Sequence, residues 1–587
     1  MEKKLFILLI ILFFSCTLPK SRNKNIEFDT LLRDYYEGSL ELYRINATFS
    51  GDSRYNDTLP NFLSIEFKKK EKKFLEYYQS ALINFDSDEL SPNQLISKRI
   101  LTRELQLQLE GKTFNTDLMP IDQMWTFQLT IGQLASGKGA QPFKTSQDYR
   151  NWLVRLEGYL EWLGSAEEKM KKGIEKGYVL PKSIIIKVLP QLLSMTKKEV
   201  TKHLFYSPIK QMPKDFTVEE KKEFKSAYSN MIENRIVPAY QRLYDFMATT
   251  YLDAGRDSSG FTAFPDGEAY YEYAIRVYTT TNLDADSIHQ LGLSEVARIR
   301  NEMEKIKNKV GFKGDLNAFF EHVRSSPELM PFNDPKQVID NFNAIFKKIK
   351  PNVDKLFSLQ PKTPFEIRRI EAFREASSAA HYNPGSLDGS RPGIFYVPIP
   401  EVEKYNVYSD EDLFLHEAIP GHHFQISLQQ ENESLPDFRK NLFYSAFSEG
   451  WALYTESLGK ELGIYNDPYQ YFGMLGAEMH RSIRLVVDTG LHAKGWTREQ
   501  AIQYSLDNEA ESLAGITSEI ERYMANPAQA LSYKIGQLKI ISLRKKAEEK
   551  MGDHFDIRIF HQKILESGAL PLSILEEKID HWIQEYI

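Results

Sequence analysis

The sequence predicts a mainly α-helical protein in which one large domain fills most of the 587 residues. Apolar residues recur at helical spacing over several long segments, whereas strand-like segments are few. After about Asn25, no repeat period, low-complexity run or Gly/Ser linker divides the chain. We therefore expect a single helical domain over residues 31–587, with a small sheet.

Long helices are expected where aromatic and aliphatic residues recur every three or four positions. In residues 149–172, for example, Trp152, Leu156 and Leu163 fall on one face of a helix. Asp334 precedes Pro335 and is a typical helix N-cap, because its carboxylate can accept from free backbone N–H groups of the first turn. The other segments with helical spacing are 219–251, 287–309, 334–356 and 529–551.

The clearest strand signal is residues 393–400, Gly-Ile-Phe-Tyr-Val-Pro-Ile-Pro, which are rich in β-branched and aromatic side chains. A turn-like segment, residues 389–393, precedes it. Pro398 has no N–H to donate to a ladder, so we expect this strand at the edge of its sheet. An edge strand can bind an extended peptide through backbone hydrogen bonds, although a plain structural hairpin is the more common case.

The overall composition excludes several classes of protein. Hydrophobic residues at 42% and charged residues at 26% are ordinary for a globular protein, and exclude a disordered chain or one that crosses a membrane many times. The 81 acidic residues slightly outnumber the 74 basic ones, which gives a net charge of -7. We expect no nucleic-acid partner, because such a partner favours a basic surface.

The first residues have the pattern of an export signal. Two lysines precede an apolar run, residues 5–14, that is too short to span a bilayer. Cys16 follows and is the only cysteine, so no intramolecular disulfide can form. A lone cysteine at this place resembles the lipobox of bacterial lipoproteins, in which the thiol is lipidated; an ordinary signal peptide with an incidental cysteine is the alternative.

We therefore expect residues 1–16 to be a signal peptide with lipidation at Cys16, and residues 17–30 to be a tether. The protein would be exported and held to the membrane by its N-terminal lipid, in the bacterial periplasm or at the outer membrane.

Residues 415–423, Leu-His-Glu-Ala-Ile-Pro-Gly-His-His, contain the parts of a hydrolytic zinc site. Such sites need three protein ligands, a water in the fourth position and a carboxylate that takes a proton from that water. The common arrangement is His-Glu-x-x-His on one helix. His416 and Glu417 fit its beginning, but the fourth residue after His416 is Pro420.

Two histidines therefore compete to be the second ligand. On a regular helix, His422 would point roughly 120° away from His416, whereas His423 would return to the same face about 10 Å along the axis. Pro420 and Gly421 should widen the turn, because proline cannot donate its helical hydrogen bond and glycine relaxes the backbone. We prefer His422 as the second ligand and keep His423 as the alternative.

Two glutamates complete the predicted site. Glu417 takes the position of the general base, which would accept the proton of the water and pass it to the leaving amine. The third ligand should come from a following helix, residues 446–462, where Glu449 lies among apolar residues. Glu456, two turns later, is its competitor, or else a second carboxylate that orients a ligand histidine.

These motifs resemble the bacterial domain-of-unknown-function family 885, which is placed in the gluzincin-type metallopeptidase clan. The resemblance covers residues from about 149 to 544, and the second histidine of the family corresponds to His422. It implies a metallopeptidase-like helical domain with a deep channel, and a short unfolded peptide as substrate. The matching segments are 388–393, 416–422, 449–454, 485–492, 522–523 and 529–533.

Further polar residues of these motifs and their surroundings are candidates for contacts with substrate: Arg391, Arg484, His492, Arg522, Tyr523 and Tyr533. The imidazole of His492, or the phenol of Tyr533 or Tyr523, could stabilise an oxyanion. The three arginines could hold the C-terminal carboxylate of a peptide through paired hydrogen bonds. Each has a structural alternative, because arginines also pair with glutamates and tyrosines pack with one polar end in water.

The sequence thus predicts a zinc-dependent peptidase, of oligopeptidase or carboxypeptidase type, that hydrolyses short peptides outside the cytoplasm. A zinc amidase acting on cell-wall peptides would use the same residues. A non-catalytic peptide-binding lipoprotein with a structural metal is a third class, although structural zinc sites usually close all four positions with Cys and His. The preferred bond and the oligomeric state stay open, and manganese or cobalt could use the same ligands.

Overall fold

The structure is a computed structural model that describes residues 24–370, 375, 379–386 and 391–586. The predicted signal peptide, Cys16 and residues 17–23 lie outside the described residues. Helix α1 (Lys24–Leu42) includes residues 24–30, which we expected to belong to a tether. That prediction is wrong for these residues, because Phe28 is fully buried in a helical core.

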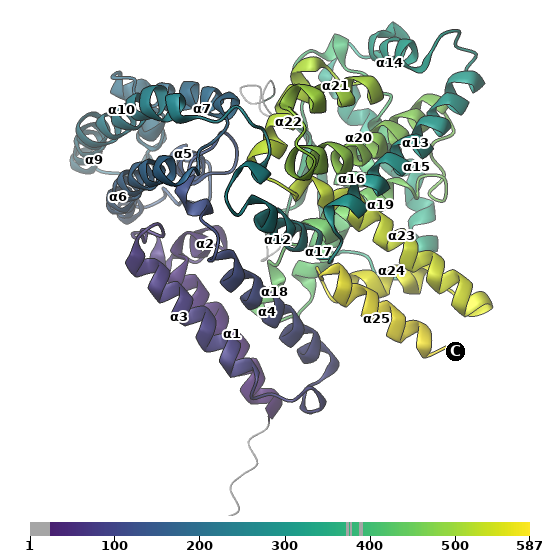
Figure 1. The fold of residues 1–587 in the computed structure, drawn as a ribbon, viewed down its shortest axis with the longest axis horizontal. Helices are drawn as coiled ribbons and strands as arrows, with labels where there is room; N and C mark the ends of the chain where they lie inside the picture. The colour runs from purple at the N-terminus through teal and green to yellow at the C-terminus, as the bar shows by residue number, and fades with distance from the viewer. Residues whose placement is uncertain (1–23, 371–374, 376–378, 387–390, 587) are drawn as a thin grey trace, which may run out of the picture.

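Helices make up most of the described chain, so the predicted mainly α fold is confirmed. Figure 1 shows the N-terminal helices as a separate layer at one corner of the molecule. Their facing sides form a small core that contains Phe28, Leu75 and Leu101. The helices of this layer are α1, α2 (Arg44–Phe49), α3 (Ile65–Leu82) and α4 (Pro92–Gly111).

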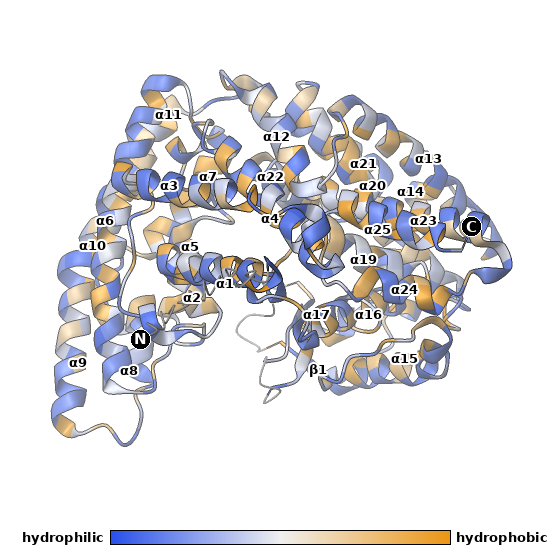
Figure 2. Cartoon of the chain, turned by 90° about the horizontal axis from the view of Figure 1, so that it is seen from below, coloured by the Kyte–Doolittle hydropathy of each residue, from blue (hydrophilic) through white to orange (hydrophobic). Residues whose placement is uncertain are grey.

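A second group of helices lies on the same side of the molecule as the N-terminal layer (Figures 1 and 2). Its longest member, α6 (Ser146–Lys176), contains the predicted helix 149–172. The predicted helix 219–251 is a continuous helical segment, in which two π-helical turns follow α9 and α10. Besides α6, the helices of this group are α5 (Phe127–Ala135), α7 (Lys182–Ser194), α8 (Ser207–Lys210), α9 (Val218–Met231), α10 (Val237–Phe246) and α11 (Leu252–Ala254).

The remaining helices form the largest group, on the other side of the molecule (Figure 1). Asp334 caps α15 as predicted, since its side chain accepts from Lys336 N at 2.8 Å. One cluster of buried apolar side chains continues from Leu59 to Ile583 through the second and third groups. The helices are α12 (Gly267–Thr279), α13 (Ala285–Lys309), α14 (Leu316–Ser325), α15 (Pro335–Leu356), α16 (Asp410–Glu417), α17 (His422–Glu431), α18 (Asp437–Lys440), α19 (Ser445–Glu456), α20 (Pro468–Ala493), α21 (Arg498–Asn508), α22 (Leu513–Ala525), α23 (Ser532–Met551), α24 (Ile557–Leu565) and α25 (Leu572–Gln584).

The sheet has three strands, β1 (Phe365–Arg369), β2 (His381–Asn383) and β3 (Gly393–Val397), in the order β1-β3-β2. β3 pairs with β1 in parallel and with β2 in antiparallel orientation. The predicted edge position of residues 393–400 is therefore wrong. β3 ends at Val397, so the missing N–H of Pro398 falls outside the ladder and does not prevent pairing on both sides.

Close helix packing places α19 in the centre of the third group. A Cβ atom on Gly450 of α19 would lie 2.5 Å from Gly536 Cα of α23, so the two backbones meet where both residues are glycine. This contact fixes the neighbouring Glu449 relative to α23. None of the helices that the structure describes combines the length and the apolar character needed to cross a bilayer.

Candidate metal centre

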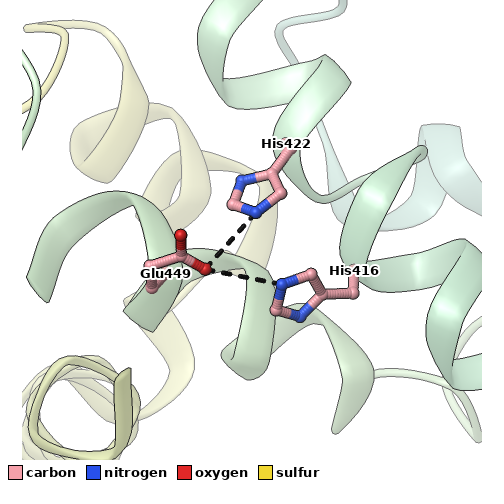
Figure 3. A group of neighbouring side chains, drawn as sticks. All are labelled: His416, His422 and Glu449. Carbon is pink, nitrogen blue, oxygen red and sulfur yellow. Dashed lines mark ion pairs between the residues drawn. The ribbon is translucent and has the colours of Figure 1, made fainter. Parts of the chain in front are cut away.

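The structure brings the three predicted ligands together. His416 lies in the last turn of α16, His422 begins α17, and Glu449 belongs to α19. Both imidazole Nε2 atoms face the carboxylate of Glu449 (Figure 3), with Glu449 Oε2 at 3.5 Å from His416 and 3.4 Å from His422. Among the described residues this is the group of side chains that could hold a metal ion.

The two histidines converge because the helix is interrupted between them. We expected a widened helical turn, but α16 ends at Glu417 and α17 begins anew at His422. A Cβ atom on Gly421 would lie 1.9 Å from His416 O, so only glycine fits at this point of the turn. The peptide bond before Pro420 is cis. The break, rather than a wider helix, turns His422 towards His416.

A second carboxylate orients His416. Its Nδ1 lies 2.7 Å from Oε1 of Glu456, a side chain that is 1% exposed. When Nδ1 donates to this carboxylate, the lone pair of His416 is at Nε2, which faces Glu449. Of the two roles that the sequence left open for Glu456, the structure therefore favours support of the histidine.

The charges of the cluster favour a cation. Burial lowers the pKa of His416, but three neighbouring carboxylates raise it to about 10. Those carboxylates belong to Glu449, Glu456 and Glu417. Burial also raises the pKa of Glu449, but the two imidazoles more than offset this and hold it well below its usual range. The site thus stabilises positive charge between the imidazoles and the carboxylates.

The spacing of the donor atoms can be compared with that of a zinc site. Ligands placed tetrahedrally at about 2.0–2.2 Å from one zinc ion lie about 3.3–3.6 Å from each other. The two separations from Glu449 Oε2, 3.4 and 3.5 Å, fall in this range, and all three donor atoms lie within 4.8 Å of one another. Two imidazoles and one carboxylate are also the donor set of many catalytic zinc sites, which leave a fourth position for water. His416, His422 and Glu449 are thus the residues that would hold a divalent ion.

His423, the alternative second ligand, lies elsewhere. Its Nδ1 is 2.9 Å from the hydroxyl of Tyr382 and 3.4 Å from that of Ser427, and its ring packs on Phe365 of β1. Burial lowers its pKa to about 4, so the ring is neutral at pH 7. His423 therefore joins α17 to the sheet, and of the two histidines it is His422 that faces Glu449.

Glu417, the predicted base, lies between the metal cluster and the sheet. Its Oε2 accepts the backbone N–H of Tyr382 at 2.8 Å, and Tyr382 belongs to the edge strand β2. Its Oε1 makes no hydrogen bond within the described part of the chain. One carboxylate oxygen is thus fixed by the strand, and the other is available to a substrate or a water.

The structure does not support a catalytic role for His492. Its Nδ1 accepts from Phe261 N at 3.1 Å, and its Nε2 donates to Tyr523 O at 3.0 Å, so backbone groups occupy both nitrogens. Burial lowers its pKa to about 3. His492 also lies about 18 Å along α20 from His480, which lines the same cavity as His416.

The two candidate tyrosines differ in whether their hydroxyl groups are already hydrogen-bonded. The hydroxyl of Tyr523 donates to Glu519 at 2.7 Å and accepts from Arg484 Nε at 3.0 Å, so it is already engaged. The half-buried Tyr533 makes no hydroxyl hydrogen bond within the described residues. Its neighbour Ser532 contacts Ser445, one turn before Glu449 on α19.

The three candidate arginines differ in exposure and in whether they already form ion pairs. Arg484 and Arg522 both form ion pairs with Glu519, at 2.9 and 3.2 Å. These two arginines therefore pair with a glutamate of the fold, as the structural alternative expects. Arg391 is exposed and comes two residues before Gly393, where an added Cβ would lie 2.2 Å from the hydroxyl of Tyr382. Because Arg391 is close to Tyr382, its charge opposes the rise in the pKa of Tyr382 that burial causes. Arg391 is therefore the candidate that a substrate beside β2 can reach.

Three side chains at the site were not identified from the sequence: Tyr382, Trp451 and Thr455. The indole Nε1 of Trp451 donates to Pro420 O at 2.8 Å, and the hydroxyl of Thr455 donates to Leu415 O at 3.0 Å. Trp451 lies within a matching motif, residues 449–454, which could have drawn attention to it. Tyr382 lies in no motif that the sequence showed.

Comparisons with known proteins give a family from one match and the same fold from two solved structures. A family model described as bacterial protein of unknown function, DUF885, matches residues 45–579. The crystal structure of a candidate lipoprotein from Colwellia psychrerythraea is similar, with a TM-score of 0.87 and 28% identity over 96% of this chain and 99% of that chain.

A candidate lipoprotein of unknown function from Shewanella oneidensis has the same fold, with a TM-score of 0.73 and 20% identity over 94% of this chain and 99% of that one. No curated protein matches the chain. Because the family model spans most of the sequence, the chain belongs to the DUF885 family of bacterial proteins of unknown function.

Proposed function

We propose that this protein is a zinc-dependent peptidase of the gluzincin type that hydrolyses short peptides outside the cytoplasm. The observation that carries the proposal is the convergence of His416, His422 and Glu449 beside the carboxylate of Glu417. Two imidazoles, one carboxylate ligand and a nearby base are the parts of one common type of hydrolytic zinc site.

The residues of the chain divide the work. A bound zinc ion would lower the pKa of a water and polarise a carbonyl group. Glu417 Oε1 is free to accept a proton from that water, while the N–H of Tyr382 holds Oε2 in place. The hydroxyl of Tyr533, which makes no hydrogen bond among the described residues, would donate one to the oxyanion that forms on the substrate.

The sheet and its surroundings support a peptide as the substrate. β2 is an edge strand, and the contact between Tyr382 and Glu417 places it beside the base. Edge strands bind extended peptides through backbone hydrogen bonds. The exposed guanidinium of Arg391 near this strand would attract a carboxylate of the substrate.

Cleavage of peptides is tested directly with purified protein. Wild type, Glu417→Gln and the control Glu433→Gln, which changes an exposed glutamate, are incubated with a mixed peptide pool and with cell-wall fragments. Mass spectrometry identifies products, and metal analysis is done on the same samples. Glu417→Gln is expected to keep its zinc and lose about 10²–10⁴-fold in cleavage rate, while Glu433→Gln matches wild type. Full activity of Glu417→Gln, or a zinc-loaded wild type that cleaves no peptide, would contradict the proposal.

We also propose that the protein is exported and anchored to the membrane through a lipid on Cys16. Support comes from the apolar segment before Cys16 and from the two similar proteins, which are described as candidate lipoproteins. Cys16→Ala is expected to move the protein from the membrane fraction to the soluble fraction. Unchanged fractionation, or a mass spectrum without a lipid on the wild type, would rule this out.

A further inference from the structure

We propose that Trp451, with a smaller contribution from Thr455, positions the two histidines and thereby sets the affinity of the site for its metal. The inference rests on the proposed metal site and extends it to side chains that touch neither metal nor substrate. Both residues belong to α19, the helix that also carries Glu449.

Trp451 holds the turn between the histidines. Its indole Nε1 donates to Pro420 O at 2.8 Å, and the side chain is fully buried. Pro420 O lies outside the helical hydrogen bonds of α17, the first of which joins Gln425 N to Gly421 O. The indole therefore satisfies a carbonyl that the helix break leaves without a helical partner, two residues before His422.

Thr455 acts on the other end of the same turn. Its hydroxyl lies 3.0 Å from Leu415 O, next to His416, and 2.7 Å from Ala452 O of its own helix. One hydroxyl proton is shared between these two acceptors, so this contact is weaker than that of Trp451. Together the two side chains fasten both ends of the turn to α19.

This arrangement makes α19 the common support of all three ligands. The helix provides Glu449 itself, contacts His416 through Glu456, and holds the backbone before His422 through Trp451. A ligand set that is already held in place pays less conformational entropy when the ion binds. The loss of the indole hydrogen bond should therefore weaken metal binding in a protein that remains folded.

The test compares two tryptophan-to-phenylalanine substitutions. Trp162 is buried like Trp451, but its indole Nε1 has no hydrogen-bond partner among the described residues. Trp451→Phe removes the hydrogen bond and some ring volume, whereas Trp162→Phe removes only the volume. Zinc affinity is measured by competition with a chelating dye, and the melting temperature of the metal-free protein reports the fold.

Trp451→Phe is expected to bind zinc about 10-fold more weakly than wild type, and Trp162→Phe within about 2-fold of it. The visible spectrum of bound cobalt(II) should change in Trp451→Phe alone, a signature that a general loss of stability would not produce. If Trp451→Phe does not fold, Thr455→Val serves instead, with a smaller loss of affinity. Equal affinities of wild type and both α19 variants, or an equal loss in Trp162→Phe, would overturn the inference. A wild type that binds no zinc would refute the proposed function itself.

Discussion

Two buried histidines, His416 and His492, lie in motifs of the same family but in different surroundings. His416 has one nitrogen on the carboxylate of Glu456 and the other facing Glu449 and His422. Both nitrogens of His492 bond to backbone groups, and its ring packs beside Phe261 and Tyr271. Carboxylates raise the pKa of the first against the effect of burial, whereas burial lowers that of the second to about 3.

The surroundings of His416 are those of a ligand-binding site, whereas the surroundings of His492 are those of a side chain that supports the fold. Carboxylates around an imidazole create a place for positive charge, which a metal ion can fill. Backbone partners on both nitrogens instead fix a neutral ring between α20, α22 and the segment before α12. Substitutions at and around the two histidines test whether His416 belongs to a metal site and whether His492 supports the fold.

The largest effect is expected for Gly421→Ala. The added Cβ would lie 1.9 Å from His416 O, a backbone atom that cannot move without breaking the turn. We expect the free energy of unfolding to fall by about 3 kcal/mol or more, with loss of metal binding. Gly476→Ala in α20 is the matched control, since a Cβ there meets nothing within 4 Å. Urea unfolding of both variants measures the effect, and equal stability of the two would contradict the account of the turn.

His492→Leu should affect the fold but not the metal. The substitution leaves the N–H of Phe261 and the carbonyl of Tyr523 buried without their partner. Each orphaned group costs about 1–3 kcal/mol, so with two of them we expect a loss of at least about 2 kcal/mol in the free energy of unfolding. Zinc affinity of the folded variant should equal that of wild type. A folded variant that loses zinc would show that His492 contributes to the metal site.

Glu456→Gln should weaken metal binding but leave the fold intact. The substitution keeps the shape of the side chain but removes the charge that supports His416. Loss of such a supporting carboxylate typically weakens metal binding about 10–100-fold. Glu461→Gln, at an exposed glutamate a few residues further on, is the control. Isothermal titration with zinc compares the two, and unchanged affinity in Glu456→Gln would show that His416 needs no such support.

The pH dependence of stability gives a smaller and independent effect. The pKa of His492 is about 3 in the folded protein, because of burial and secondarily the charge of Arg256, against about 6.5 in the unfolded chain. Between pH 3 and pH 6.5, His492 is therefore protonated in the unfolded chain but neutral in the folded protein. Its contribution to the free energy of unfolding is complete above pH 6.5 and is lost as the pH falls. Wild type should lose about 1.4 kcal/mol per pH unit below 6.5 relative to His492→Leu.

Urea unfolding of the metal-free proteins at pH 7, 6 and 5 measures this difference. His561, also buried with a pKa of about 3, is present in both proteins, so its effect cancels. A difference that stays constant over this range would mean that His492 is not a buried neutral ring.

Periodicity was enough to predict the long helices, because their apolar faces pack on one continuous core, and Asp334 was recognisable from the residue that follows it. The convergence of His416, His422 and Glu449 was predictable, because their residue types and spacing are those expected of a hydrolytic zinc site. The central position of β3 was not, since strand order depends on partners far away in the sequence. The role of His492 was missed for a similar reason, as its partners Phe261 and Tyr523 come from distant segments.

We expect one divalent ion to bind between His416, His422 and Glu449. The adjacent pair His422 and His423 offers the most direct test, because only the first faces Glu449. Zinc content per chain is measured by plasma mass spectrometry for wild type, His422→Gln and His423→Gln after dialysis against a weak chelator. We expect one zinc in wild type and in His423→Gln, and none in His422→Gln. Zinc retained by His422→Gln and lost from His423→Gln, or absent from wild type, would contradict the account.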